Sequence, residues 1–118
     1  MSKIKHKEVL IDFLDTNVVF TYGKKTYSKY LMNKFDIDKS FDHAGIATEL
    51  QSDTHYSNVV GLRKCKCIYT LKSIMVHEVS HVVTHIINHY NIQDDEFRSY
   101  LNQYLYTKGI FFIEEMTQ

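Results

Sequence analysis

The alternation of hydrophobic and polar residues predicts two strands near the N-terminus. Residues 8–14 alternate and then become apolar, which is typical of a strand that is buried on one face. Asp15-Thr16-Asn17 has the composition of a turn, and residues 18–22 form a second apolar stretch that ends at Gly23. We therefore predict a β-hairpin over residues 8–22, with one long, bent strand as the alternative.

The hydrophobic period changes to that of a helix over residues 26–35. Apolar residues recur there at helical spacing, with lysines between them: Tyr27, Tyr30, Leu31 and Phe35. This pattern predicts a surface helix that lies on the sheet. Residues 36–53 are polar and keep no period, so we expect an irregular connection, of the kind that often borders a functional site. Residues 58–63 predict a further short strand.

Residues 68–90 form the longest periodic segment of the chain. Its apolar residues surround most of the helix circumference: Ile74, Met75, Val76, Val79, Val82, Val83, Ile86 and Ile87. A helix that is apolar nearly all round is predicted to be buried. Asp94-Asp95-Glu96 then opens a final helix, because acidic residues oppose the dipole at a helix N-terminus. Residues 110–113 fit either an extension of that helix or a short strand.

Length and composition predict one compact domain over residues 1–118. The chain has 118 residues, 44% of them hydrophobic, and no net formal charge. A neutral balance gives no reason to expect nucleic acid or an anionic membrane as partners. Neither a signal peptide nor a run of about eighteen apolar residues is visible. Cys65 and Cys67 are too close in sequence for an unstrained disulfide, so we expect free thiols.

The run His77-Glu78-Val79-Ser80-His81 carries the most specific chemistry of the chain. On a helix, two histidines four residues apart stand one turn above each other and can bind one metal ion. The glutamate beside the first histidine faces the open positions of that ion. This is the HExxH pattern of zinc metallopeptidases, in which the glutamate activates the attacking water.

Two further histidines continue the series at the same interval. His77, His81, His85 and His89 are each four residues apart, and each step turns about 40° around the helix. His77 and His81 therefore share a face, whereas His89 points elsewhere and His85 lies between. Burying two imidazoles and a carboxylate in an apolar helix is costly unless a cation satisfies them. We therefore predict a metal site built on His77 and His81 only.

A catalytic zinc site needs a third protein ligand and one open position. Glu96 is the predicted third ligand, because it lies fifteen residues after His81, in the first turn of the next helix. A short connection would run that helix back against the histidine helix. Asp94 and Asp95 are the competing candidates, although Asp94 better fits the role of helix cap.

The chain resembles small phage-encoded zinc metallopeptidases of the gluzincin-like kind. The resemblance follows the strand that ends near Gly23 and the helix entry at residues 24–27. It continues through residues 42–45, residues 59–62, the HExxH run and residues 94–101. In such proteins a glutamate at the position of Glu96 heads a helix that carries a tyrosine at the position of Tyr100. The resemblance implies an α+β, minimal zincin-like domain, with a small antiparallel sheet (hairpin plus edge strand) packed on a central HExxH helix. His43 departs from the pattern, since an acidic or small residue is more usual there.

The predicted mechanism is hydrolysis of a peptide bond. With Zn²⁺ held by His77, His81 and Glu96, Glu78 would take a proton from the attacking water and return it to the leaving amine. The oxyanion needs a further donor. The sequence offers four unranked candidates for this contact or for other substrate contacts: Tyr100, Tyr104, His85 and His43. The strand at residues 59–62 would offer an edge to an extended substrate.

Two functions follow from this pattern. The first is a zinc-dependent metallopeptidase that acts on a peptide or protein substrate. The second is a non-catalytic phage virion or accessory protein, with a structural or vestigial zinc site and other virion proteins as partners. The resemblance places either protein in the host cytoplasm or in the virion. An open position beside Glu78 would favour the enzyme, and a closed four-ligand site would favour the structural role.

Overall fold

Four strands and three α-helices form an α+β fold, as the sequence predicts. The computed structural model describes residues 5–117. In chain order the elements are β1 (His6–Ile11), β2 (Thr16–Tyr22), α1 (Lys24–Phe35), β3 (Gly45–Gln51), β4 (Tyr56–Leu62), α2 (Ile68–Tyr90) and α3 (Asp95–Met116). A short 3-10 turn, Asp12–Leu14, joins β1 to β2 and makes the predicted hairpin. The turn therefore ends at Asp15, and Thr16 and Asn17 already belong to β2.

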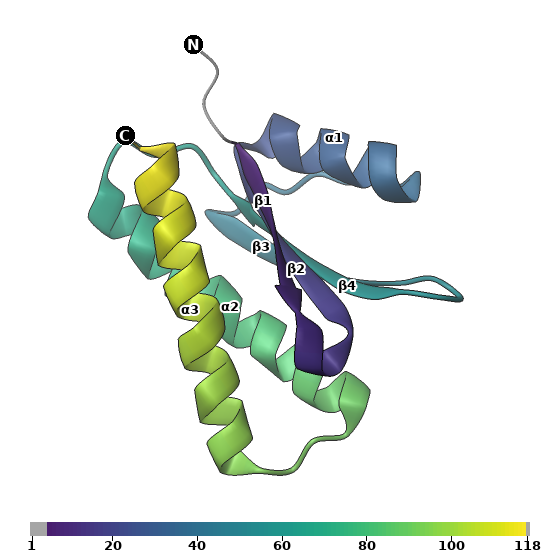
Figure 1. Ribbon diagram of the computed structural model, residues 1–118. Helices are drawn as coiled ribbons and strands as arrows, with labels where there is room; N and C mark the ends of the chain where they lie inside the picture. The colour runs from purple at the N-terminus through teal and green to yellow at the C-terminus, as the bar shows by residue number, and fades with distance from the viewer. Residues whose placement is uncertain (1–4, 118) are drawn as a thin grey trace.

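The sheet is mixed, which corrects the predicted antiparallel sheet. Its strand order is β1-β2-β4-β3, with β2 parallel to β4 and the two outer pairs antiparallel. After β2 the chain crosses one face of the sheet through α1, forms β3 at the far edge, and returns as β4 beside β2 (Figure 1). β3 therefore runs opposite to β2, and the β3–β4 hairpin reverses the chain again, so that β4 lies parallel to β2. The predicted strand near residues 58–63 is thus central, and β3 is the edge.

β3 lies inside the segment that was expected to be irregular. Ile46, Thr48 and Leu50 face α1, where the Thr48 hydroxyl hydrogen-bonds Tyr27 at 2.5 Å. Gly45, Ala47 and Glu49 alternate with them and face α2. Small and polar residues on that second face hide the two-residue period in the sequence. Within the predicted segment, the parts without regular structure are therefore residues 36–44 and the start of the hairpin tip at residues 52–53.

Each face of the sheet is covered by its own helices. α1 packs on one face against Val19 and Val59, whereas α2 and α3 cover the other face (Figure 1). The larger core joins alternate strand residues such as Phe20 and Val60 to the inner faces of both long helices. Two packed layers on a central sheet bury enough apolar surface for a stable small domain.

α2 spans the predicted residues 68–90, but it is not buried all round. One face is solvent-exposed and carries Ser73, Val76, His77, Ser80, His81, Thr84 and Asn88. The sequence pattern overstated burial because Val76, counted as a core residue, is 48% exposed. The prediction of two buried imidazoles is therefore wrong, since His77 and His81 are exposed. Glu78 is the one buried charged residue of the motif.

α3 continues without a break to Met116, so residues 110–113 are helical. Phe112, Ile113 and Met116 are buried in the larger core at helical spacing. Asp94 caps the helix as predicted, since its carboxylate accepts a hydrogen bond from the Glu96 amide at 2.9 Å. Across residues 5–117, no helix is both long and apolar enough to cross a membrane.

Substituting Gly61 by alanine should destabilise the sheet by about 1–3 kcal/mol, the usual cost of overpacking a core. A Cβ atom there would lie 2.9 Å from both Phe41 Cε1 and Tyr27 Cδ2, and these buried rings have little room to move. Urea unfolding would show a lower midpoint. Ser57→Ala, on the same face of β4, is the matched control and should not destabilise, because the buried Ser57 hydroxyl has no partner in the described chain. Equal midpoints for the glycine variant and the wild type would contradict this packing.

Candidate metal centre

His77 and His81 stand together on the exposed face of α2. Their Nε2 atoms are 3.2 Å apart, and the two rings are nearly perpendicular, at 81°. Two nitrogens bound to one tetrahedral zinc at about 2.0–2.1 Å would lie roughly 3.4 Å apart. The pair therefore fits two coordination positions of one zinc ion. Without an ion, the same spacing suits one N–H···N hydrogen bond between neutral rings.

Glu78 is the buried member of the motif, with only 5% of its surface exposed. One helical residue turns it about 100° from His77, away from solvent and toward the start of β3. Gly45 makes room for it, because a Cβ atom at Gly45 would lie 3.0 Å from Glu78 Oε2. Burial raises the pKa of Glu78, and the nearby imidazoles of His77, His81 and His43 oppose that shift. A carboxylate that resists ionisation is a stronger base once ionised.

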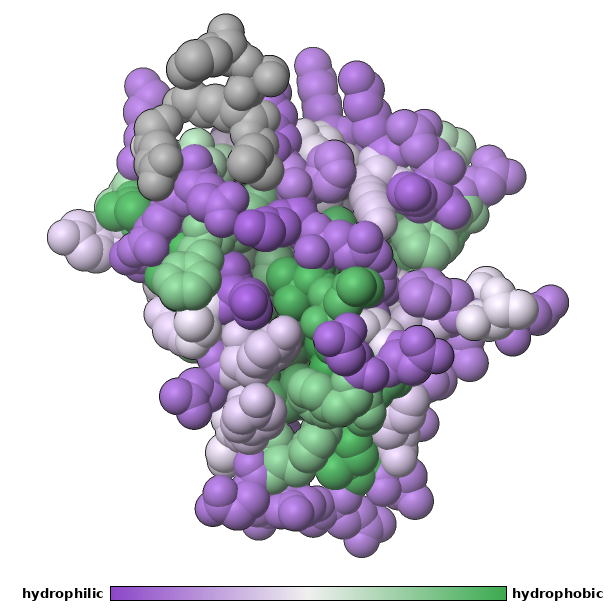
Figure 2. All heavy atoms as spheres, in the orientation of Figure 1, coloured by the Kyte–Doolittle hydropathy of each residue, from purple (hydrophilic) through white to green (hydrophobic). Residues whose placement is uncertain are grey.

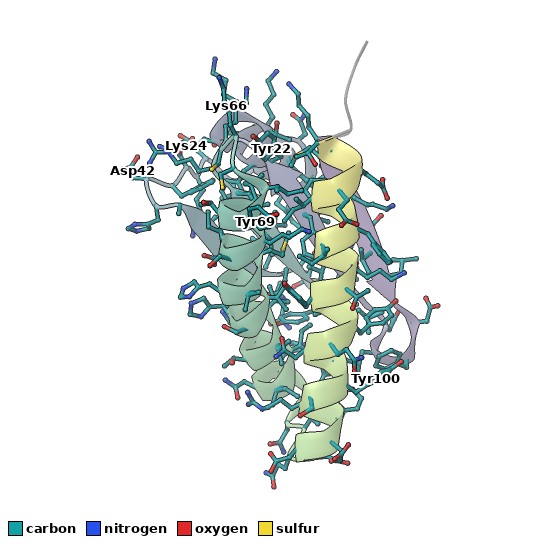
Figure 3. The ribbon with its side chains drawn as sticks, turned by 90° about the vertical axis from the view of Figure 1, so that its left-hand side faces the viewer. Tyr22, Lys24, Asp42, Lys66, Tyr69 and Tyr100 are labelled. Atoms are coloured by element: carbon teal, nitrogen blue, oxygen red, sulfur yellow. The ribbon has the colours of Figure 1, made fainter. Side chains whose placement is uncertain are left out.

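A hollow of about 420 Å³ joins these three residues to the sheet edge. It is lined by residues 43–47 and by His77, Glu78, His81 and His85. One wall is thus the exposed side of α2, and the other is β3, which pairs with a strand on only one side. The segment before β3 also reaches the hollow, through His43, which is exposed. Figure 3 shows the neighbouring Asp42 projecting beyond the α2 side of the molecule.

His85 lies at the far end of the same hollow and is held from beneath by the sheet. Its Nδ1 is 2.8 Å from Oδ1 of Asn58, which is fully buried in β4. With the amide oxygen of Asn58 as the acceptor, Nδ1 carries the proton and a neutral ring leaves Nε2 free as an acceptor. Burial lowers the pKa of His85 and favours the neutral form. His85 lines the hollow, and a substrate contact from it stays a prediction.

His89 points away from the pair, as the drift of the series predicts. Its ring stacks on Tyr56 with centroids 3.6 Å apart. Tyr56 in turn donates a hydrogen bond from its hydroxyl to Glu49 Oε2 at 2.6 Å. His89, the last histidine of the series, is thus a packing residue at the end of α2.

The structure does not bring Glu96 to His77 and His81. α2 continues for nine residues beyond His81 to Tyr90, a rise of about 13 Å, before the chain turns into α3. Glu96 is exposed in the first turn of α3, next to the far end of α2. The bounds of α2 agree with the prediction, but the remaining length of the helix beyond His81 places Glu96 at its far end rather than beside the motif. Asp95, beside it in the same turn, is equally removed, and Asp94 is the helix cap.

Tyr100 and Tyr104 also lie away from the hollow. Both rings pack on Phe13, in the turn between β1 and β2, with centroids 6.3 and 6.4 Å from it. The Tyr104 hydroxyl donates to the Leu10 carbonyl at 3.4 Å. Figure 3 shows Tyr100 on the side of α3 that faces away from α2. These contacts are structural, so neither tyrosine is placed to touch a substrate bound at His77 and His81.

Phe13, which both tyrosines contact, is part of an exposed apolar strip that also includes Leu10. Figure 2 shows hydrophobic residues gathered along β1 and the turn that follows it. Leu10 is 60% exposed and Phe13 is 51% exposed. The strip lies on a different side of the fold from the hollow and adds no ligand to it.

A larger hollow, of about 1300 Å³, lies on the α1 face of the sheet. Its polar wall is a hydrogen-bonded chain in which Asn17 contacts Glu8 and His55. Lys29 and Lys34 of α1 also line it, and so do apolar residues such as Leu50. Size alone does not mark a site, and here Glu8 and His55 already bond to Asn17. The smaller hollow holds the chemistry because the two imidazoles of the motif and the buried Glu78 carboxylate meet there.

Three residues of the candidate site were not identified from the sequence. Gly45 was noted only as part of the resemblance at residues 42–45, Glu49 and Asn58 beside the hollow were given no role, and β3 itself was not expected. One signal was available: Asn58 precedes Val59 and Val60 in an otherwise apolar strand, where a buried amide needs a reason.

No protein-family model matches the chain, and neither curated proteins nor solved structures gave a match. The class of protein is therefore argued from the site alone. No three His, Cys, Asp or Glu side chains within residues 5–117 lie close enough together to hold a metal ion. The site consists of two convergent imidazoles and a buried carboxylate beside an unpaired strand edge.

Proposed function

We propose that the protein is a zinc-dependent metallopeptidase that hydrolyses peptide bonds at His77, Glu78 and His81. The observation that supports this most is the 3.2 Å separation of the two Nε2 atoms, next to a carboxylate that is 5% exposed. A purely structural helix gains nothing from burying that carboxylate. In a hydrolase the same arrangement supplies two ligands and a base.

Each residue has a distinct role in this proposal. His77 and His81 bind the ion through Nε2. Zinc, when bound, lowers the pKa of water from roughly 15.7 to about 7 and polarises a carbonyl group. Glu78 accepts a proton from the attacking water as the C–O bond forms, and delivers a proton to the amine nitrogen as the C–N bond breaks.

His43 is the proposed third ligand in place of Glu96. It lines the same hollow as His77 and His81, and its charge acts on Glu78. It is exposed in the irregular stretch before β3, so its side chain can turn toward the pair without disturbing a strand or helix. His85 is the less suitable candidate, because its ring is already bonded to Asn58.

The substrate is proposed to lie along β3. A sheet edge presents unpaired backbone N–H and C=O groups, which an extended peptide can pair with. Residues 45–47 line the hollow beside Glu78, so a peptide added there would pass over the carboxylate. The expected edge at residues 59–62 is not available, because β4 is covered on both sides by β2 and β3.

Metal content and hydrolysis of a mixed peptide library test the proposal directly. Wild-type protein purified with zinc supplementation should carry one zinc per chain and cleave peptides, and the chelated protein should do neither. His77→Ala should lose the zinc while keeping its fold, because His77 is exposed and adds little to the core. Wild type without stoichiometric zinc would end the proposal.

One observation favours a second function, that of a non-catalytic virion or accessory protein with a structural or vestigial zinc site. The described residues contain no complete set of three ligands, as a vestigial site would. Zinc bound by the wild type with no hydrolysis of any peptide, at any tested concentration, would favour this function over the peptidase.

A further inference from the structure

Beside His85, at the end of the hollow, the sheet forms a wall that carries hydrogen-bond acceptors. Glu49 and Asn58 are directly paired residues of β3 and β4, and both face α2. Asn58 holds His85 at 2.8 Å, and Tyr56 donates to Glu49 at 2.6 Å. Both bonds consume donors of the protein. They leave the second oxygen of Glu49, which is exposed, and Nε2 of His85, which lines the hollow, free to accept further hydrogen bonds.

Asn58 is costly for the fold, which suggests a role outside it. Its side chain is fully buried among Val60 and Leu62 on the core face of β4, where its amide lies against His85 and Tyr56. Burying an amide in an apolar face costs free energy. A valine would complete the apolar face without that cost, so the benefit of Asn58 is the tautomer that it imposes on His85.

No cationic side chain of the surrounding elements neutralises this wall. β3 and β4 contain no lysine or arginine, and the only one in α2 is Lys72, which pairs with Glu114 at 3.5 Å. The titratable groups that face the wall are His81, His89, Tyr56 and Glu49 itself. Burial and the bond to Glu49 raise the pKa of Tyr56 far above its ordinary value, so the phenol keeps its proton.

We infer that Glu49 and His85 form a subsite for a lysine or arginine side chain of the peptide substrate. An ammonium or guanidinium group brings several donors and no acceptor, which complements two acceptors and one negative charge. Glu49 lies four residues along β3 from Gly45, about 14 Å. Antiparallel pairing with β3, the more stable arrangement, then puts the basic residue roughly two to four positions N-terminal to the scissile bond.

The position of this subsite rests on the proposed peptidase function. Peptide binding, measured without hydrolysis, tests the subsite separately from that function. The probes are two fluorescent peptides that differ only by lysine or norleucine at that position. The protein is zinc-loaded Glu78→Gln, which binds peptide without cleaving it. The lysine peptide should bind about tenfold tighter, because the norleucine peptide lacks the charged hydrogen-bond donor, and tenfold corresponds to about 1.4 kcal/mol. Glu49→Gln should remove most of that preference, and the matched control Asp53→Asn, an exposed change at the tip of the same hairpin, should keep it.

A second measurement reports on His85 without any peptide. Nitrogen-15 NMR of the imidazole should find the proton on Nδ1 in the wild type, and Asn58→Leu should shift it toward Nε2. A wild-type ring protonated on Nε2 overturns the inference, and so does equal binding of the two peptides. A lysine preference in a wild type that cleaves nothing would reject the peptidase and leave the subsite standing.

Discussion

Replacing Glu78 by glutamine should leave zinc binding intact and lower peptide hydrolysis by about 10²–10⁴-fold, the usual contribution of general acid–base catalysis. The amide fills the same space beside Gly45 but cannot accept and return a proton. His77 and His81 should keep their positions, because their contact with each other does not involve the Glu78 side chain. Zinc stoichiometry and steady-state hydrolysis, measured on the same preparation, check both parts.

The fold of this variant provides its own control. Glu78 is buried, and a neutral amide avoids the cost of burying a charge, so the melting temperature without zinc should be no lower than that of the wild type. Glu114→Gln makes the same chemical change at an exposed position on α3 and should leave both zinc and activity unchanged. Full activity in Glu78→Gln would exclude this carboxylate as the base.

Replacing His43 by alanine should weaken zinc binding more than any change in the first turn of α3. Loss of a direct ligand should exceed the roughly 10–100-fold that loss of a ligand's hydrogen-bond partner costs. Glu96→Ala should have little effect, because Glu96 lies beside the end of α2, beyond Tyr90. Competition with a zinc-binding dye gives the affinities of both variants and of the wild type.

The opposite order of zinc affinities would support Glu96, the third ligand predicted from the sequence. If Glu96→Ala weakened zinc binding and His43→Ala did not, α3 would have to approach the motif in the zinc-bound protein. Asp95→Ala separates charge from coordination, since it removes the same charge from the same turn. A cobalt-substituted sample adds a spectroscopic test, because loss of one ligand changes the visible absorption of tetrahedral cobalt.

The local parts of the fold were predictable, and the parts set by strand order were not. The bounds of α2 follow from its hydrophobic period, and the cap at Asp94 follows from its side chain. β3 escaped prediction because glycine, alanine, threonine and glutamate occupy it. The position of β4 between two strands depends on the path of α1 across the sheet, which no local pattern encodes.

The candidate site also has features that could be predicted from the sequence and features that could not. The meeting of His77 and His81 is fixed by helix geometry and was foreseen. The placement of Glu96 depended on how far α2 runs beyond the motif, and a count of residues between ligands does not measure that distance. The burial of Glu78 and the support of His85 by Asn58 both depend on which strand lies under α2. Those two features could only be found in the assembled structure.

Every residue of the proposed site comes from one uninterrupted stretch, residues 43–85, formed by the β3–β4 hairpin and the helix that follows it. The remaining elements, the first hairpin, α1 and α3, support this stretch from behind without entering the hollow. Contacts between neighbours in sequence form early and at low entropic cost. The geometry of the site is therefore specified by a short span of the chain. Insertions, exchanged loops or fused partners at either terminus would be expected to leave that geometry unchanged.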